Sequence, residues 1–151
     1  MPSANGNALL SNTHQSCYKP YYSMPSQTQF KGKEGERMAE MYLREHGYLI
    51  LARNYRFRRV ELDLICMVPG ARDPQRGTLV FVEVKFRTSR MFGWPESAVT
   101  LSKQKNIVQA ARAFVHQNCM ERCSCRFDVI SIRTVSDRLE VRHFQDAFRL
   151  S

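Results

Sequence analysis

The sequence TLVFVEVKFRTS, residues 78–89, has the Val and Phe content of a buried β-strand, yet it contains Glu83 and Lys85. Because side chains alternate between the two faces of a strand, both charged residues project from one face, next to Phe81. The opposite face is apolar and consists of Val82, Val84 and Phe86. Burying an ion is costly unless it is compensated, so we expect a salt bridge, a metal ion or a phosphate group beside this strand.

The composition predicts one basic globular domain. A chain of 151 residues can form one sizeable hydrophobic core but not two. Its 23 Lys and Arg outnumber its 14 Asp and Glu, and the net charge of +9 favours a polyanionic partner, with nucleic acid as the first candidate. The sequence has no apolar run of membrane-spanning length, no strongly basic amphipathic helix and no secretory signal. We therefore expect a cytoplasmic protein without a membrane partner.

The chain divides into a flexible N-terminal extension, residues 1–30, and a folded domain, residues 31–151. The extension is rich in Ser, Asn, Gln, Pro and Tyr, has Lys19 as its one charged residue and shows no hydrophobic periodicity. The domain begins with a predicted helix that Gly47 ends. Further periodic segments predict, in order, strands at 49–58, 60–68 and 78–86, a helix at 102–118, and strands at 126–134 and 138–144. This αβββαββ order predicts an α/β fold.

The second predicted strand repeats the unusual feature of the third. The sequence VELDLICMV, residues 60–68, places two acids on one face, Glu61 and Asp63. The other face is expected to hold Leu62, Leu64 and Cys66. If the two strands pair as a hairpin, Asp63 lies close to Glu83 and Lys85. Two carboxylates with water and a phosphate oxygen suit Mg²⁺ or Mn²⁺, and a neighbouring lysine can hold an attacking water or offset negative charge on phosphorus.

A structural alternative explains the same residues without chemistry. Glu83 or Asp63 would form a cross-strand salt bridge with Lys85 on a solvated face of an antiparallel sheet. Exposed ion pairs of this kind contribute little to stability. An acid on one strand, Glu-x-Lys on the next and a further acid on a preceding helix form a more demanding pattern than one ion pair. From the residues alone, both interpretations remain open.

The five cysteines are expected to be reduced, because their number is odd and the chain carries no export signal. Cys119, Cys123 and Cys125 follow His116 closely in the sequence, and zinc can use four ligands of these types. Their spacing does not match paired Cys-x-x-Cys ligands, however. Free thiols at the junction of a helix and a strand are therefore expected.

Several segments, in the same order, resemble the bacterial YraN-type family of predicted endonucleases. They are GKEGERMAEMYL with Glu36, RNYRFRRVELDLI, LVFVEVKFRTSRMFGWPESAVTLSKQKNI, RFDVISI and the closing DAF, and together they span about Lys31 to Phe148. Val60 departs from the usual glycine of the family at its position. The family is similar in turn to the Holliday-junction resolvase-like branch of the PD-(D/E)XK nuclease superfamily. The resemblance implies a restriction-endonuclease-like fold, a mixed β-sheet flanked by helices.

The resemblance also implies roles for individual residues. Asp63, Glu83 and Lys85 match the catalytic motif, in which the two acids hold Mg²⁺ or Mn²⁺. Glu36 matches a catalytic acid of the first helix in the resolvase-like branch. Accessory candidates are Glu61, Lys103 and Gln104.

A run of arginines is expected to contact the phosphate backbone of nucleic acid without reading its sequence. The arginines alternate with polar and aromatic residues before the second strand, and more of them follow the third strand. The candidates are Arg53, Arg56, Arg58, Arg59, Arg87 and Arg90. The alternative is that these charges only cover a solvated surface.

These features predict a metal-dependent DNA endonuclease that hydrolyses phosphodiester bonds, with branched recombination or repair intermediates as one substrate class. The competing prediction is a non-catalytic nucleic-acid-binding subunit in DNA repair, recombination or uptake. The acids favour the enzyme, because a pure binder gains little by burying carboxylates against a polyanion. Nothing in the sequence separates DNA from RNA, and a homodimer would suit the cleavage of two strands.

Overall fold

The computed structural model describes residues 32–73, 76–87, 99–135 and 138–149. This part of the chain contains two helices, α1 (Gly32–Glu45) and α2 (Leu101–Gln117). Its strands are β1 (Leu49–Phe57), β2 (Val60–Val68), β3 (Thr78–Arg87), β4 (Ser124–Val135) and β5 (Arg138–Phe148). The αβββαββ order predicted from the sequence is confirmed. The extension predicted at residues 1–30 lies outside the described residues.

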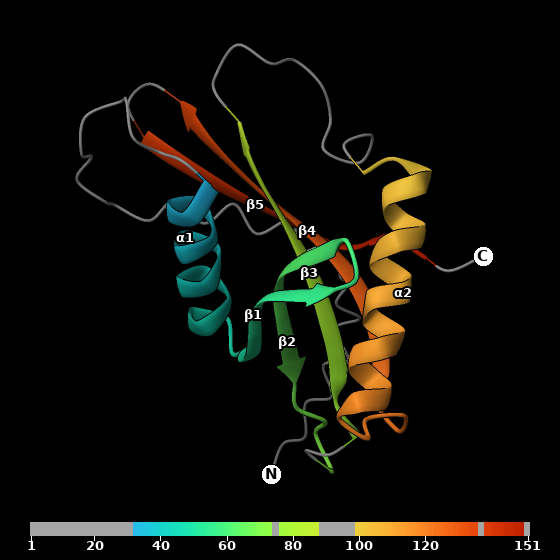
Figure 1. Cartoon of the computed structure of the whole chain (residues 1–151). Helices are drawn as coiled ribbons and strands as arrows, with labels where there is room; N and C mark the ends of the chain where they lie inside the picture. The colour runs from blue at the N-terminus through green and yellow to red at the C-terminus, as the bar shows by residue number, and fades with distance from the viewer. Residues whose placement is uncertain (1–31, 74–75, 88–98, 136–137, 150–151) are drawn as a thin grey trace, which may run out of the picture.

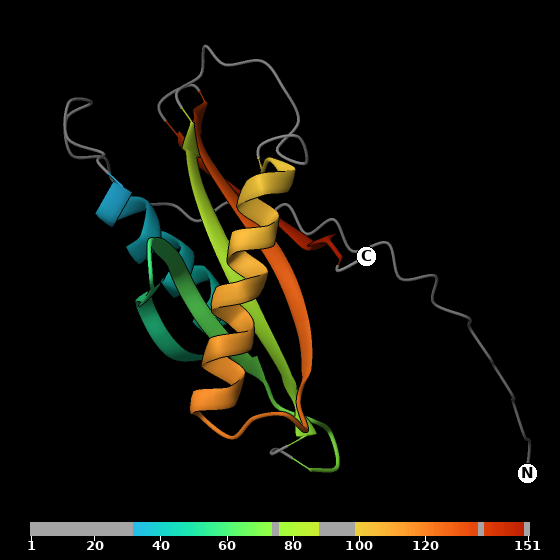
Figure 2. The same cartoon turned by 45° about the vertical axis from the view of Figure 1, so that its right-hand side comes forward.

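The strands form one mixed sheet in the order β1-β2-β3-β4-β5 (Figure 1). β3 and β4 are parallel, whereas the other neighbouring strands are antiparallel. Antiparallel neighbours can be joined by short turns, but a parallel pair needs a crossover, and α2 provides it between β3 and β4 (Figure 2). The α/β fold with a mixed sheet is therefore as predicted.

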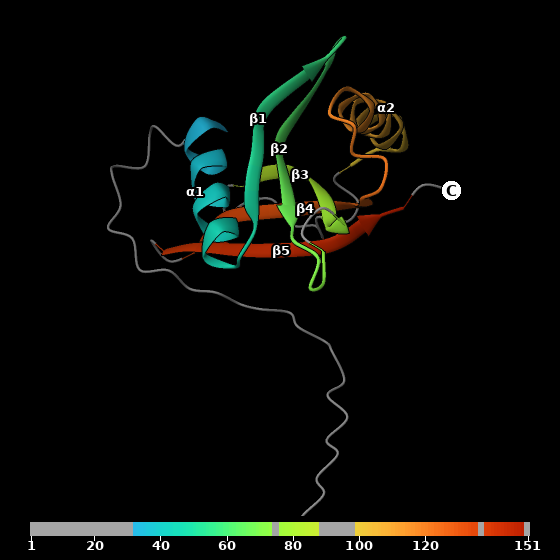
Figure 3. The ribbon, with the colours of Figure 1, turned by 90° about the horizontal axis from the view of Figure 1, so that it is seen from below.

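The two helices cover opposite faces of the sheet (Figure 3). The core on the α1 face is built around Leu43, Leu64, Val82, Ile130 and Val141. The core on the α2 face is built around Ile65, Phe81, Ile107, Phe114 and Phe127. Phe81 and Val82 thus lie on opposite faces, as the alternation in β3 predicted, and Glu83 points toward the α2 face. Neither of the described helices is long and apolar enough to cross a membrane.

The end of α1 follows from Gly47, as the sequence predicted. Gly47 has φ +81°, a conformation that side chains with a Cβ rarely adopt. Its backbone N–H donates to the carbonyl of Arg44 at 3.0 Å, and the N–H of Tyr48 donates to the carbonyl of Leu43 at 3.0 Å. These two bonds form a Schellman motif, which satisfies the last helical carbonyls and turns the chain into β1.

The hairpin of β1 and β2 corrects one expectation. Leu62 belongs to the core on the α2 face, whereas Leu64 belongs to the core on the α1 face, so they do not share a face. The outer half of the hairpin bends toward α2 and is anchored there by Tyr55, whose hydroxyl donates to Oε1 of Gln117 at 2.7 Å. Asn54 lies opposite Asp63, between the paired positions Arg53–Leu64 and Tyr55–Leu62. Its φ of +48° is a left-handed conformation, which interrupts the regular pleat of the strand at this point.

A buried polar network joins β4 to β5. Asp128 is 0% exposed, and its carboxylate accepts two hydrogen bonds from Arg126, each of 2.9 Å. It also accepts one from Nε2 of His143 at 2.8 Å and one from the backbone N–H of Asp146 at 3.0 Å. Arg126 donates further, at 2.8 Å, to the hydroxyl of Tyr48, the residue before β1. A buried charge is tolerated when its hydrogen bonds are satisfied in this way.

Candidate active site

Asp63 lies where β2 and β3 separate. Pairing between these strands runs from Val68 opposite Thr78 to Leu64 opposite Val82 and stops there. One position further along, Oδ2 of Asp63 accepts a hydrogen bond from the backbone N–H of Val84 at 2.7 Å. The carboxylate therefore takes the place of the next backbone acceptor and is held in the gap between the strands.

Glu83 lies beside this gap and is bound by lysines from two elements. Its side chain is 5% exposed, and Oε1 forms a salt bridge of 2.7 Å with Nζ of Lys85. The same oxygen also accepts a hydrogen bond from Nζ of Lys103, in the first turn of α2. The second oxygen, Oε2, is buried and has no hydrogen-bond partner among the described residues. A buried carboxylate oxygen without a partner is rare and costly, which marks this atom as a candidate ligand.

The first turn of α2 brings Lys103 to the site. Thr100 caps this helix, because its Oγ1 accepts a hydrogen bond from the backbone N–H of Lys103 at 3.3 Å. Sequence analysis did not identify Thr100, although Thr before a helical segment is a recognised capping signal. Burial lowers the pKa of Lys103, but the hydrogen bond and the charge of Glu83 together raise it by more than burial lowers it, so the net shift is upward. Lys103 therefore remains a cation at the site.

The two acids repel one another. Burial, followed by the charge of Glu83, raises the pKa of Asp63 to about 6. The hydrogen bond from Val84 opposes this shift, and the charge of Glu36 on α1 adds to it. The structure thus brings Asp63, Glu83, Lys85 and Lys103 into one cluster and places Glu36 within electrostatic range of it.

Replacing Asp63 by Asn should raise the free energy of unfolding at neutral pH in metal-free buffer. The folded pKa of about 6 lies above the value for unfolded chains, about 3.9, so ionisation of Asp63 destabilises the fold as pH rises through this window. The gain should approach roughly 3 kcal/mol above about pH 6 and vanish below about pH 4. Thermal melts of both proteins across this range measure it, and a constant difference at every pH would contradict it.

The donor set fits a hard divalent cation that keeps part of its water shell. The partnerless oxygen of Glu83 and the carboxylate of Asp63 are oxygen donors, the type that Mg²⁺ and Mn²⁺ prefer. Among the described residues, no three His, Cys, Asp or Glu side chains form a ready-made metal site. Water or a phosphate oxygen would have to complete the coordination. The same finding covers Cys119, Cys123, Cys125 and His116, and no disulfide joins cysteines within the described residues.

Two of the accessory candidates take part in other interactions. Gln104 donates from Nε2 to the backbone carbonyl of Val99 at 2.9 Å, which stabilises the start of α2. Glu61 is exposed and forms an ion pair of 3.2 Å with Arg56 on the hairpin. Lys103 is the accessory candidate that contacts the acidic cluster.

The arginine candidates fall into different groups. Arg53 forms two hydrogen bonds of 2.6 Å with Glu40, and these lower the pKa of Glu40 to about 2. It is therefore part of a strong ion pair with α1. Arg58 and Arg59 form the exposed hairpin turn and have no acidic partner among the described residues; the guanidinium of Arg58 lies 5.3 Å from the ring centre of Phe57. The side chain of Arg87 and all of Arg90 lie outside the described residues.

Fold and site together define an α/β protein whose mixed sheet carries a cluster of acids and lysines at the point where two strands separate. The chain belongs to the family described as "Uncharacterised protein family UPF0102", whose model matches residues 35–132. This is the YraN family, so the family assignment made from the motifs is confirmed. The matched range includes all four residues of the cluster.

The relatives align over most of the chain. A UPF0102 protein of Chlorobium phaeobacteroides is 42% identical over 132 residues, which cover 83% of this chain and 98% of the relative. A UPF0102 protein of Symbiobacterium thermophilum is 43% identical over 118 residues, covering 78% and 94%. Among solved structures, SfsA of Pyrococcus furiosus in complex with Ca²⁺ matches with a TM-score of 0.30 and 10% identity. That match covers 82% of this chain and 65% of SfsA, slightly less than two thirds of its length.

Proposed function

We propose that this protein is a metal-dependent nuclease that hydrolyses phosphodiester bonds in DNA. The observation that carries the proposal is the partnerless Oε2 of Glu83, buried beside the carboxylate of Asp63. A surface salt bridge would leave neither a buried orphan oxygen nor an acid with a raised pKa. Both features are expected of a site in which a cation offsets the repulsion between two acids.

Asp63 and Glu83 would hold Mg²⁺ or Mn²⁺, which would supply Lewis-acid polarisation of the phosphate and lower the pKa of a bound water. Lys103 keeps Oε1 of Glu83 in place, so that Lys85 can turn toward the substrate. From there, the ammonium of Lys85 orients the attacking water or offsets the negative charge that develops on phosphorus. Glu36 supports the site from α1, directly or through a water.

The second candidate function is a nucleic-acid-binding subunit that does not catalyse. One observation favours it: two lysines already neutralise Oε1 of Glu83 without any ion. In that case the cluster is a structural ion-pair network, and the site should bind no divalent cation.

Calorimetric titration of the wild type with Mg²⁺ and Mn²⁺, with and without DNA, tests the proposal. Binding should release protons below about pH 6, because a cation displaces the proton of Asp63. Labelled branched, nicked, duplex and single-stranded DNA, with matching RNA strands, should then reveal which substrate is cleaved. A protein that binds neither cation, even with DNA present, refutes the nuclease and leaves the binding subunit.

Replacing Arg58 and Arg59 together by Ala should weaken DNA binding and reduce its salt dependence. Both residues stand at the hairpin turn without acidic partners in the described structure, so their charges are available to phosphates. If both contact the backbone, the slope of log K against log salt should become shallower by about two units. Arg72→Ala is the single-charge control, because it removes an exposed charge beyond the opposite end of β2. An equal effect per removed charge in the two variants would show a non-specific loss of net charge.

A further inference from the structure

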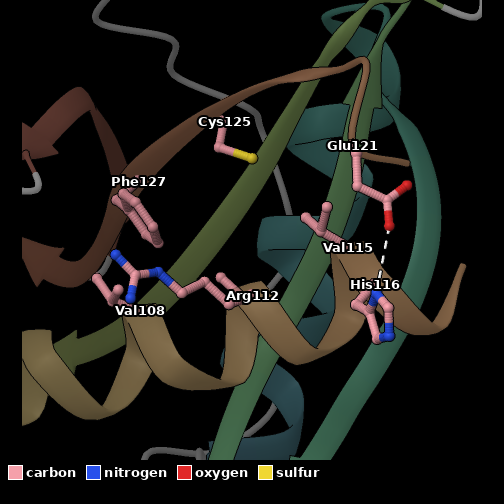
Figure 4. A pocket seen from close by; sticks show the side chains of 8 residues that line it. Val108, Arg112, Val115, His116, Glu121, Cys125 and Phe127 are labelled. Carbon is pink, nitrogen blue, oxygen red and sulfur yellow. Dashed lines mark hydrogen bonds and ion pairs between the residues drawn. The ribbon is translucent and has the colours of Figure 1, made fainter. Parts of the chain in front are cut away.

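A pocket of about 210 Å³ lies between α2 and the beginning of β4, outside the cluster of acids and lysines (Figure 4). Its apolar part is formed by Val108, Ala111, Val115 and Phe127. Phe127 stacks with Phe81 at 5.5 Å and with Phe148 at 5.0 Å between ring centres, so three rings support this wall. A pocket of this size can take one flat ring but not a larger ligand.

Polar side chains surround the opening of the pocket. Arg112 extends along α2 toward Val108 and Phe127 (Figure 4) and has no acidic partner among the described residues. His116 is paired with Glu121, with Nδ1 3.4 Å from Oε1. The opening therefore combines an available guanidinium with an aromatic and aliphatic wall.

A line of positive charge runs along α2 to this opening. The helix contains no Asp or Glu between Leu101 and Gln117. Lys105 and Arg112 are exposed and seven residues apart, which places them on the same side of the helix, about 10 Å from each other along its axis. Lys103 points to the sheet instead, where it contacts Glu83. The exposed side of α2 thus carries two cations, Lys105 near the start of the helix and Arg112 at the pocket, and α2 contains no acid to offset them.

We propose that the pocket binds one unpaired base of a DNA strand whose phosphates contact Lys105 and Arg112. This inference rests on the proposed nuclease function and defines its substrate as nucleic acid with a single-stranded segment. Sites for single strands combine a basic track along the backbone with apolar or aromatic surfaces on which bases stack, and this is the combination found along α2. A paired base cannot enter, because its edge and both faces are already covered within the duplex.

The thiol of Cys125 lines the pocket from β4 and reports its occupation. In the full chain with Cys17, Cys119 and Cys123 replaced by Ser, Cys125 is the accessible thiol, since Cys66 is buried. Burial raises the pKa of Cys125, and this cause persists when Cys123 is replaced, so alkylation by iodoacetamide is best measured at mildly alkaline pH. A saturating single-stranded DNA oligonucleotide, with EDTA to prevent cleavage, should slow alkylation about tenfold. An abasic strand of equal length and a blunt duplex should leave the rate nearly unchanged.

Variants give a second measurement. Cys125→Phe fills the pocket without changing any charge and should weaken binding of the single strand about tenfold, but not of the duplex. Lys105→Gln with Arg112→Gln should weaken binding of the single strand and make its salt dependence shallower, and the effect per removed charge should exceed that of the single-charge control Arg72→Gln. Divalent-cation binding should be unchanged in all of them, because none of these residues contacts Asp63 or Glu83.

The outcomes separate this inference from the proposed function. Cleavage and metal binding with no protection of Cys125, or with equal protection by the abasic strand, overturn the base pocket and leave the nuclease intact. Protection of Cys125 without metal binding or cleavage supports the base pocket and refutes the nuclease. If no oligonucleotide binds and an aromatic acidic peptide protects Cys125 instead, both are wrong and the pocket is a protein-docking site.

Discussion

Glu83→Gln should abolish DNA cleavage, and Lys85→Ala should reduce it about a thousandfold while metal binding persists. Glu83 supplies a candidate ligand oxygen, so its loss should weaken cation binding as well as the reaction. Lys85 contacts Glu83 and would interact with the phosphate mainly in the transition state, which affects kcat more than binding. Single-turnover cleavage and calorimetric titration measure the two effects separately.

The same two variants distinguish a catalytic cluster from a structural one. Glu83→Gln leaves Lys85 and Lys103 close together without their acid, so it should not share the stabilisation expected of Asp63→Asn. Glu45→Gln, an exposed acid at the end of α1, is the control and should retain full activity. Wild-type cleavage rates in Lys85→Ala would exclude Lys85 from the reaction. Unchanged metal affinity in Glu83→Gln would exclude Glu83 as a ligand.

Asp128→Asn should destabilise the fold by about 3–5 kcal/mol, the usual cost of leaving a buried charge without its partner. The variant preserves the shape of the side chain but leaves Arg126 without its counter-charge and adds an amide donor where Asp128 accepted hydrogen bonds from Arg126 and His143. Thermal melts should show a fall in Tm of about 10 °C or more.

The contribution of Asp128 also predicts a pH dependence. Burial raises the pKa of Asp128, but the hydrogen bonds from His143 and Arg126 together lower it by more than burial raises it, so the net shift is downward. Its stabilising effect is therefore complete above the unfolded value of about 3.9 and is lost as pH falls through the lower folded value. Asp146→Asn is the matched control, because the Asp146 side chain pairs with Arg149 at the surface and Asn tolerates its positive φ. If both variants have the same Tm as the wild type, the network around Asp128 does not stabilise the fold.

Local sequence patterns were sufficient for the order of the elements and for the faces of β3. Apolar residues at a period of two place Phe81 opposite Val82, and this alternation depends only on the geometry of a single strand. The end of α1 at Gly47 was equally predictable, because one glycine in a left-handed conformation completes a local hydrogen-bond pattern. The alternation of side chains along a strand also places Glu83 and Lys85 on one face of β3, so this pair of charges could be recognised from the sequence.

Contacts between distant segments determined the rest. Leu62 and Leu64 take opposite faces because the hairpin bends to pack Tyr55 against α2, and no strand periodicity contains that bend. Lys103 reaches Glu83, and Arg53 reaches Glu40, through the crossover of α2 and the packing of α1 on the sheet. Whether a charged residue is available for catalysis or bound in an ion pair depends on which partner the folded chain places within hydrogen-bonding distance, and a one-dimensional pattern of charges does not contain that distance.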